Sequence, residues 1–502
     1  MNKRVVSVFS ALILFLIIFT PIVPVEGVTW SDETQLTTYG GWDTLPSITQ
    51  MSDSRIWVVW QSRNTHQDIY YKIYNLTTGL WTDDTPLITD VSHDTAPSII
   101  QVENGTIWVF WSSNSTGNYN IFYITSSDNG DNWTDSFQLT ADPGTDSNPS
   151  VAQAEDGKIW VVWQRQIDAD QDIFYRIYNG SWSDEMPLIT GPSYDRLPSI
   201  AHMTDGRTWV AWHSFNRTGT EAFDIFYTVY NGSSWHETQL TNSSNIDVDP
   251  TVLQDRNGMI WVVWASHEPI EEYQDDLYYK TSCDNGGNWT DRVQLYYHPN
   301  DDLWPSIAQI SDKKIWIVYV SNRNNNYDLY YKTSSEIPVH DVATTKITLS
   351  STTVYQGENV TINVVAENQG EFAETFNVTA YANTTVIGTQ NITDLAPGVN
   401  MTLFFTWNTT SVLPGHYVIS ATAETVPGEC MDADNKRTGD TVQVKIIGDI
   451  DGDGDVDPED FASFAGAYGT SPPSNPECDL DGDGDVDPED FATFAGKYGR
   501  HV

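Results

Sequence analysis

A short apolar segment with a tryptophan near each end recurs along the first two thirds of the chain. It reads Ile-Trp-Val-Val-Trp at residues 56–60, and variants of it follow at intervals of about fifty residues. Both faces of the segment are apolar, which is typical of a strand packed between two layers. The further copies lie at residues 107–111, 159–163, 208–212, 260–264 and 315–319. We interpret the segment as a central strand of a repeated unit.

Three further segments accompany each copy in a fixed order. An Asp-x-x-Pro element precedes it, as at residues 43–46, and an Asp-Ile-Tyr-Tyr type strand follows, as at 68–71. A tryptophan and a Gln-Leu-Thr strand end the unit, as at 133–140. Four short strands at this period are the signature of a β-propeller blade. We therefore predict a mainly β chain with a propeller over residues 28–335.

The order of the strands predicts how the ring closes. A tryptophan-led strand stands at residues 30–37, ahead of the first complete unit, and the sixth unit ends after residues 328–331 without one. We expect the N-terminal strand to complete the last of six blades, because this leaves no open sheet edge.

Two turns ahead of an outer strand share the pattern Ser-x-Asp-x-Gly-x-x-Trp. They resemble Asp-boxes, the turns of sialidases and other propeller proteins. The resemblance implies a structural role, in which the carboxylate caps backbone amides, the tryptophan packs between strands, and the turn lies on the face opposite the active centre. The residues are Ser126, Asp128, Gly130 and Trp133, and Ser282, Asp284, Gly286 and Trp289.

From residue 339 the blade pattern gives way to alternating strands that continue to residue 446. A segment of this length suits one small β-sandwich. The strings His-Asp-Val-Ala from residue 340, Val-Ala-Glu-Asn-Gln-Gly from 365, Leu-Ala-Pro-Gly from 395, Trp-Asn-Thr from 407 and Asp-Asn from 434 resemble those of the CARDB family. That resemblance implies an immunoglobulin-like adhesion or spacer domain without catalysis.

Residues 448–499 hold two near-identical acidic loops, each followed by a short apolar stripe. Carboxylates at loop positions 1, 3, 5, 9 and 12, with glycine at position 6, suit a hard cation such as Ca²⁺, and position 7 offers its backbone carbonyl. Asp457 and Asp487 also stand where they would cap a helix that begins with proline. We predict two calcium ions, held by Asp449, Asp451, Asp453, Asp455, Asp457 and Asp460, and by Asp479, Asp481, Asp483, Asp485, Asp487 and Asp490.

Both loops have aspartate at position 12, and no helix precedes either one. Two such loop-and-helix units, thirty residues apart, resemble a type I dockerin. The resemblance implies a small helical domain over 448–499 that folds on calcium and docks to a cohesin domain of another protein. Its selectivity positions are Pro458-Glu459 and Pro488-Glu489 in place of the usual Ser/Thr pair, so the cohesins that fit the usual pair are not expected to fit here.

The formal net charge of −45 disfavours nucleic acid and anionic lipid as partners, because like charges repel. Adaptation to high salt is an alternative explanation of the acidity. Residues 1–27 combine a basic start with an apolar run, as in a secretory signal peptide, although an uncleaved anchor remains open. Fifteen Asn-X-Ser/Thr sequons agree with export. We expect a secreted or cell-surface protein that does not insert into a membrane after cleavage.

Three cysteines exclude a complete disulfide framework. Cys430 and Cys478 are candidates for a bond across the last domain junction, and Cys283 has no assigned partner.

The loops that lead into the six inner strands each carry an aspartate three residues before the proline. Six-fold repetition favours a structural role for these aspartates, since Asp in such a turn bonds to its own backbone. They are Asp43, Asp94, Asp146, Asp195, Asp247 and Asp302.

The loops between second and third strands differ from blade to blade, as expected of function grafted on a scaffold. Together with Arg196 on an entry loop, they supply candidates for binding a glycan or a protein: Arg63, His66, Arg165, Arg196, His213, Arg217, His267 and Arg323. Sialidase chemistry would need three converging arginines, but the family's Arg-Ile-Pro element is missing from the first blade, and its nearest counterpart is at residues 196–198.

These patterns predict an exported, non-catalytic protein that binds glycan or protein through its propeller and a cohesin-bearing partner through its dockerin. A dockerin-tethered glycoside hydrolase and a structural cell-envelope component are the alternatives, and no catalytic residue is assigned.

Overall fold

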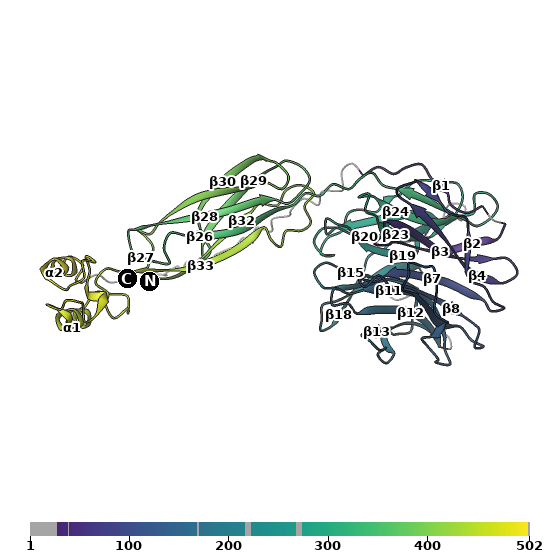
Figure 1. The fold of residues 1–502 in the computed structure, drawn as a ribbon, viewed down its shortest axis with the longest axis horizontal. Helices are drawn as coiled ribbons and strands as arrows, with labels where there is room; N and C mark the ends of the chain where they lie inside the picture. The colour runs from purple at the N-terminus through teal and green to yellow at the C-terminus, as the bar shows by residue number, and fades with distance from the viewer. Residues whose placement is uncertain (1–27, 39, 168–169, 216–221, 268–273, 500–502) are drawn as a thin grey trace, which may run out of the picture.

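The computed structural model describes residues 28–38, 40–167, 170–215, 222–267 and 274–499. The predicted signal peptide, residues 1–27, lies outside these ranges. Figure 1 shows an elongated molecule with a propeller at one end, a β-sandwich arm in the middle and a tail of two short helices at the other end. The mainly β prediction is confirmed, since helices of the described part are confined to the tail. No helix in the described ranges is long and apolar enough to cross a membrane.

The propeller consists of antiparallel sheets whose innermost strands surround a common axis. Blades 3 and 4 share one sheet, joined by a single parallel pair between Gln171 and Tyr194. From the axis outwards, the first three blades contain β2 (Trp42–Gln50), β3 (Arg55–Arg63), β4 (Gln67–Asn75), β5 (Leu80–Trp81) and β6 (Thr85–Ile88); β7 (Asp94–Gln101), β8 (Ile107–Ser113), β9 (Asn120–Ser126) and β10 (Phe137–Gln138); and β11 (Thr145–Gln153), β12 (Ile159–Ile167), β13 (Asp170–Tyr178) and β14 (Met186–Ile189).

The remaining three blades repeat this order. They contain β15 (Tyr194–His202), β16 (Thr208–Phe215), β17 (Phe223–Tyr230) and β18 (Trp235–Gln239); β19 (Ile246–Gln254), β20 (Ile260–His267), β21 (Asp276–Ser282) and β22 (Val293–Gln294); and β23 (Asp302–Gln309), β24 (Ile315–Ser321), β25 (Asp328–Thr333) and β1 (Thr34–Gln35).

The ring closes as the sequence predicts. The N-terminal strand β1 pairs with β25, the third strand of the last blade, with Thr34 opposite Tyr331 and Gln35 opposite Tyr330. The outer strands are shorter than expected, because β1, β10 and β22 keep only two residues each in regular pairing.

The tryptophans of the repeated segment form the contacts between blades. Each interface holds its own apolar cluster. At five of the six interfaces, the first tryptophan of the segment lies against a tryptophan from the next blade's outer turn. Trp57 contacts Trp133 in this way, and Trp209 contacts Trp289. Burying an aromatic side chain contributes roughly 1.5–3 kcal/mol, so the repeated interfaces account for much of the propeller's stability.

The second tryptophan of the segment binds four of the six aspartates in the ring. The indole N–H of Trp111 donates to Asp94 at 2.9 Å, and that of Trp163 donates to Asp146 at 3.1 Å. The same bond recurs at Asp195 and Asp247, and all four carboxylates are buried. A structural role is thus supported for these four aspartates, although the partner is an indole and not the turn backbone that the sequence suggested. Asp302 instead accepts hydrogen bonds from Tyr296 and Arg323.

The arm is a sandwich of two sheets around one apolar core. Val360, Phe376 and Trp407 lie in that core, and alternating residues of the same strands face solvent. One sheet contains β26 (Val342–Leu349), β28 (Asn359–Asn368) and β31 (Asn400–Asn408), and the other contains β27 (Thr353–Tyr355), β33 (Lys436–Lys445), β32 (Gly415–Ala423), β29 (Glu374–Ala382) and β30 (Thr385–Leu395).

The arm is fastened to the propeller beneath blades 5 and 6. A disulfide joins Cys283, inside the second Asp-box turn, to Cys430 of the arm. Glu371 of the arm also pairs with Arg256 at 2.9 Å and Lys313 at 2.8 Å. The expected pairing of Cys430 with Cys478 is therefore wrong, since Cys430 faces the propeller while Cys478 is a free thiol in the tail's core.

The tail consists of residues 448–499 and contains α1 (Pro458–Ala467), the 3-10 turn η1 (Pro476–Cys478) and α2 (Pro488–Ala495). Both helices begin with proline and are capped by the preceding aspartate, Asp457 or Asp487. Phe464 and Phe494 stack at 5.1 Å in a small core between the helices. The two loop-and-helix units thus pack against each other through equivalent residues.

Candidate functional site

A small cavity lies on the propeller axis and is lined by the same three-residue element from each of six inner strands. In every one of these strands the pairing register shifts at this element, which is a β-bulge. The element reads X-Pro-Ser or X-Pro-Thr, and residue X has a left-handed backbone. The six X residues are Leu45, Ala96, Asn148, Leu197, Asp249 and Trp304, with φ between 48° and 57°.

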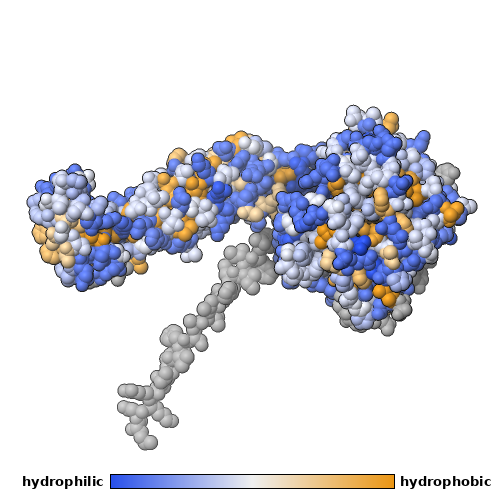
Figure 2. Space-filling model, turned by 60° about the horizontal axis from the view of Figure 1, so that its bottom comes forward, coloured by the Kyte–Doolittle hydropathy of each residue, from blue (hydrophilic) through white to orange (hydrophobic). Residues whose placement is uncertain are grey.

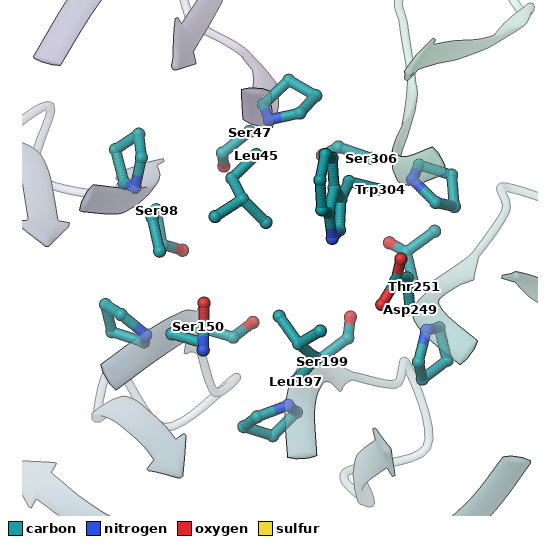
Figure 3. Close-up of a pocket in the computed structure, with 18 residues that line it drawn as sticks. Leu45, Ser47, Ser98, Ser150, Leu197, Ser199, Asp249, Thr251, Trp304 and Ser306 are labelled. Carbon is teal, nitrogen blue, oxygen red and sulfur yellow. The ribbon is translucent and has the colours of Figure 1, made fainter. Parts of the chain in front are cut away.

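Left-handed backbone at a residue other than glycine costs roughly 1–3 kcal/mol, and it persists where the surrounding structure enforces it. Here it turns side chains toward the axis: Leu45, Leu197, Asp249 and Trp304 point into the central space (Figure 3). The sequence showed the Asp-x-x-Pro repeat but not the direction of the residue before proline. The variability of that residue, inside an otherwise repeated element, is the signal that marks it.

The repeated part of the element forms the wall of the cavity. The hydroxyl of Ser47 accepts a hydrogen bond from the backbone N–H of Ile99 in the next blade at 3.2 Å, and Ser306 accepts from Ile48 at 3.2 Å across the closure of the ring. The enclosed volume is about 120 Å³. That space holds roughly four water molecules or a small organic group.

Asp249 carries the single carboxylate among the residues that line this cavity. Burial raises its pKa to about 7, the charge of Asp275 adds to this effect, and the Trp304 backbone N–H opposes it. Its own N–H donates to Nδ1 of the buried His213 at 3.0 Å, and burial lowers the pKa of His213 to about 3. The imidazole is therefore neutral, and the carboxyl group changes its charge near neutral pH.

Two of the candidate arginines are engaged inside their own blades. Arg165 is buried and donates to Asp146 at 2.6 Å and to Glu185 at 2.6 Å. Arg323 pairs with Asp302 and Glu33, both at 3.1 Å. These ion pairs hold both guanidinium groups within their own blades, so the two arginines do not converge on one position where a substrate carboxylate could bind.

The other candidates lie at separate points around the ring. Arg63 is exposed beside the ring of Trp42 at 5.5 Å, and Arg196 lies beside Tyr194 at 5.4 Å. His66 lies near His93, and His267 bonds to Asp275 at 3.0 Å. Arg217 lies outside the described residues. Among the predicted residues that the structure describes, His213 alone bonds to a residue of the axial cavity's wall, Asp249, and none lines the cavity itself.

The two Asp-box turns have the same geometry. Asp128 accepts from the N–H of Asn132 at 2.9 Å, and Asp284 accepts from that of Asn288 at 2.7 Å. Ser126 and Ser282 bond to these carboxylates at 2.8 and 2.9 Å. The serine and aspartate side chains of both motifs are therefore engaged in hydrogen bonds within the turn.

Oxygen atoms converge in both acidic loops of the tail. Asp460 is fully buried, and its carboxylate accepts from the N–H groups of Ile450 at 2.6 Å, Asp451 at 3.1 Å and Asp457 at 2.9 Å. Asp490 repeats this arrangement in the second loop. The predicted ligands form groups whose oxygens lie within 4.8 Å of one another: Asp449, Asp451 and Asp460; Asp455, Asp457 and Asp460; Asp479, Asp481 and Asp483; and Asp483, Asp485 and Asp487.

The donor set of these loops fits a hard divalent cation. Like charges at such distances repel by roughly 3 kcal/mol per pair at the effective dielectric of a protein surface. One oxygen of Asp485 is buried without a hydrogen-bond partner, although its position in the loop is beside the other ligands. A cation coordinated by six to eight oxygens would remove both penalties.

Residues 339–427 match the CARDB family, within the segment predicted to be that domain. No curated protein sequence matches the chain significantly. A Dyadobacter fermentans protein of unknown function is structurally similar, with a TM-score of 0.53 and 9% identity over 62% of this chain and 100% of its own. This similarity concerns the fold alone.

Two enzymes resemble the propeller more distantly. A Penicillium chrysogenum α-L-arabinanase matches with a TM-score of 0.46 and 15% identity over 60% of this chain and 98% of its own. The NanB sialidase of Streptococcus pneumoniae matches with a TM-score of 0.46 and 9% identity over 60% of this chain and 70% of its own.

Proposed function

We propose that this is an exported binding protein that recognises a glycan or protein with its propeller and attaches to a partner through a calcium-dependent tail. The observation that carries the proposal is the pair of equivalent acidic loops, each with a buried carboxylate at position 12 and with groups of three carboxylates whose oxygens converge. Converging carboxylates repel one another and so destabilise a fold by themselves, whereas they suit the coordination of Ca²⁺.

The axial cavity supports binding rather than hydrolysis. Hydrolysis of a glycosidic bond uses two carboxyl groups that flank the bond. The cavity wall offers only Asp249, together with apolar side chains and the indole of Trp304. One acid beside an aromatic ring suits recognition of a sugar or a side chain that enters the mouth.

A glycoside hydrolase is the second candidate, and one observation favours it. The charge of Asp275 acts on Asp249, and burial raises the pKa of both carboxyl groups. A carboxyl group that is partly protonated near pH 7 beside a second acid is the pattern of a general acid in such enzymes. The two candidates differ in whether sugar is released.

The tail supports docking through the starts of its helices. Pro458, Glu459, Pro488 and Glu489 are exposed, and Phe461 and Phe491 expose 45% of their surface beside them. Figure 2 shows apolar patches at the end of the tail, separated by hydrophilic surface. Because the two units are equivalent, a cohesin domain would meet the same residues in either of two orientations.

The test uses the full chain and two assays. Calorimetry with Ca²⁺ is expected to find two sites, and replacement of Asp460 and Asp490 by alanine is expected to abolish both. Incubation with a panel of polysaccharides is expected to release no sugar. Sugar release that disappears in the Asp249→Asn and Asp275→Asn variants would favour the hydrolase, and absence of calcium binding would overturn the docking proposal.

A further inference from the structure

A second and larger hollow lies away from the axis, between blades 3 and 4. Its volume is about 850 Å³, within the usual range of ligand sites. Its wall includes the turn between β11 and β12 and the turn between β13 and β14, so it opens on the face that carries the Asp-box turns. It shares no lining residue with the axial cavity. We call this hollow the side cleft.

The side cleft is lined by a stacked aromatic pair. Trp160 and Tyr175 stack with their centroids 5.4 Å apart and their planes at 13°. Equivalent stacked pairs exist in four other blades, and two of them are useful for comparison: Trp57 stacks on Tyr71 at 4.8 Å and Trp209 stacks on Tyr227 at 4.7 Å. The three pairs therefore differ mainly in what covers them.

In those two other blades an Asp-box turn from the next blade covers the pair. Gly130 lies so close to Trp57 that an added Cβ would be 2.5 Å from the indole, and Gly286 lies equally close to Trp209. Only glycine permits this approach, because any side chain would collide with the ring. Trp57 and Trp209 are accordingly 1% and 0% exposed.

The turn over Trp160 is two residues shorter than an Asp-box turn. It runs from Tyr230 to Trp235, whereas the equivalent turn of blade 5 runs from Ser282 to Trp289. Its glycine, Gly232, has no atom within 4 Å of an added Cβ, and Trp160 is 7% exposed. The side cleft is thus the space that an Asp-box turn fills elsewhere in the ring.

The rim of the side cleft is polar and nearly neutral. Lys158 pairs with Asp156 at 2.5 Å, and Glu155 is exposed beside them. His202 shares a hydrogen bond with Thr208 at 3.0 Å, and burial lowers its pKa, which keeps it uncharged at neutral pH. Carboxylate, ammonium and amide groups around aromatic rings bind molecules that have many hydroxyl groups and an apolar ring face.

We propose that the side cleft binds a neutral oligosaccharide. Sugar rings pack mainly against the half-buried Tyr175, with Trp160 behind it, and hydroxyl groups bond to Glu155 and Lys158. The side cleft is separate from the axial cavity and from the tail. This proposal is therefore independent of whether the cavity or the tail binds its own proposed partner.

The decisive variant restores the missing cover. In the full chain, residues 230–235 are replaced by the sequence of residues 282–289, with serine at the position of Cys283. The probes are cellohexaose, xylohexaose, mannohexaose and chitohexaose, measured by calorimetry. At least one is expected to bind the unmodified chain, and the covered variant is expected to lose that binding.

Point variants keep the test valid if the covered variant does not fold. Glu155→Ala and Lys158→Ala alter exposed side chains, and each is expected to weaken binding about tenfold, the usual effect of losing one hydrogen bond to a charged group. Glu103→Ala alters the exposed glutamate at the equivalent position of blade 2 and serves as the matched control, which is expected to leave binding unchanged. Asp249→Asn is measured as well, to detect binding at the axial cavity.

Three outcomes would overturn the proposal: no probe binds, binding persists at full strength in Glu155→Ala and Lys158→Ala, or binding depends on Asp249 instead. The last outcome would move the oligosaccharide to the axial cavity and would support the proposed function without the side cleft.

Discussion

The propeller and the tail differ in what fills their interiors. Each interface between blades encloses an apolar cluster with at least one buried tryptophan or tyrosine, and the buried carboxylates between them accept hydrogen bonds from indole N–H groups. The tail has one small cluster around Phe464 and Phe494. It carries fifteen acidic residues and one lysine, Lys497. We infer that apolar burial can fold the propeller, and we propose that the tail folds only when a cation offsets the repulsion among its carboxylates.

A domain of about fifty residues is near the lower limit at which an apolar core can stabilise a fold by itself. In the tail this limit coincides with strong repulsion among carboxylates. The following predictions test the difference between the two regions, beginning with the largest effect.

Asp146→Ala is expected to destabilise the propeller by about 3–5 kcal/mol, because it leaves the buried guanidinium of Arg165 and the indole of Trp163 without their main acceptor. Thermal unfolding of the propeller measures the effect, which should not depend on Ca²⁺. Asp156→Ala removes the partner of the exposed Lys158 and serves as the control, with a loss of no more than about 1 kcal/mol. Equal losses in both variants would contradict the structural role of the aspartate ring.

Replacing Cys283 and Cys430 together by serine is expected to lower the stability of the arm by about 2–4 kcal/mol, since the bond closes a loop of 147 residues. Differential scanning calorimetry should show the arm's transition at a lower temperature and the propeller's unchanged. Cys478→Ser alters a thiol that makes no disulfide and should affect only the tail. An unchanged arm in the double variant would mean that the other contacts at this joint suffice.

The arm should become more stable as the pH falls from about 8 to about 5. Burial raises the pKa of Glu429 to about 7 and that of Asp341 to about 6. The folded arm therefore keeps protons that the unfolded chain releases, and stability is lost as pH rises through the folded pKa.

Glu429→Gln removes the Glu429 carboxyl group, so that its protonation no longer contributes to the pH dependence of stability. The variant should show a pH dependence smaller by roughly 2 kcal/mol, measured by urea unfolding at several pH values. A slope equal to that of the unmodified chain would rule out Glu429 as its source.

The sequence predicts the propeller well because the same four-strand unit repeats along the chain. The recurring Ile-Trp-Val-Val-Trp segment defines the blades, and the extra strand at Thr34–Gln35 predicts the closure with β25. The aspartates three residues before proline were interpreted as structural from their repetition, and four of the six accept the same indole hydrogen bond. Repetition allows each copy to test the interpretation of the others.

Features that depend on how separate parts meet were not predictable in this way. The bulge that turns Asp249 and Trp304 toward the axis depends on the curvature of six strands at once. The bond between Cys283 and Cys430 depends on how the arm packs beneath blade 5. The side cleft lies beside a turn that is two residues shorter than an Asp-box turn, and it becomes apparent only when the blades are compared in three dimensions.

Hydrogen exchange of the full chain, with Ca²⁺ and after its removal by a chelator, tests the central claim most directly. With Ca²⁺, amides of α1, α2 and both acidic loops should be protected, and after chelation their protection should be lost while β3, β8 and β12 exchange as slowly as before. Asp460→Ala should reproduce the chelated state, and Glu459→Gln should not. Protection of the tail that survives chelation, or protection of the propeller that is lost with it, would contradict the account.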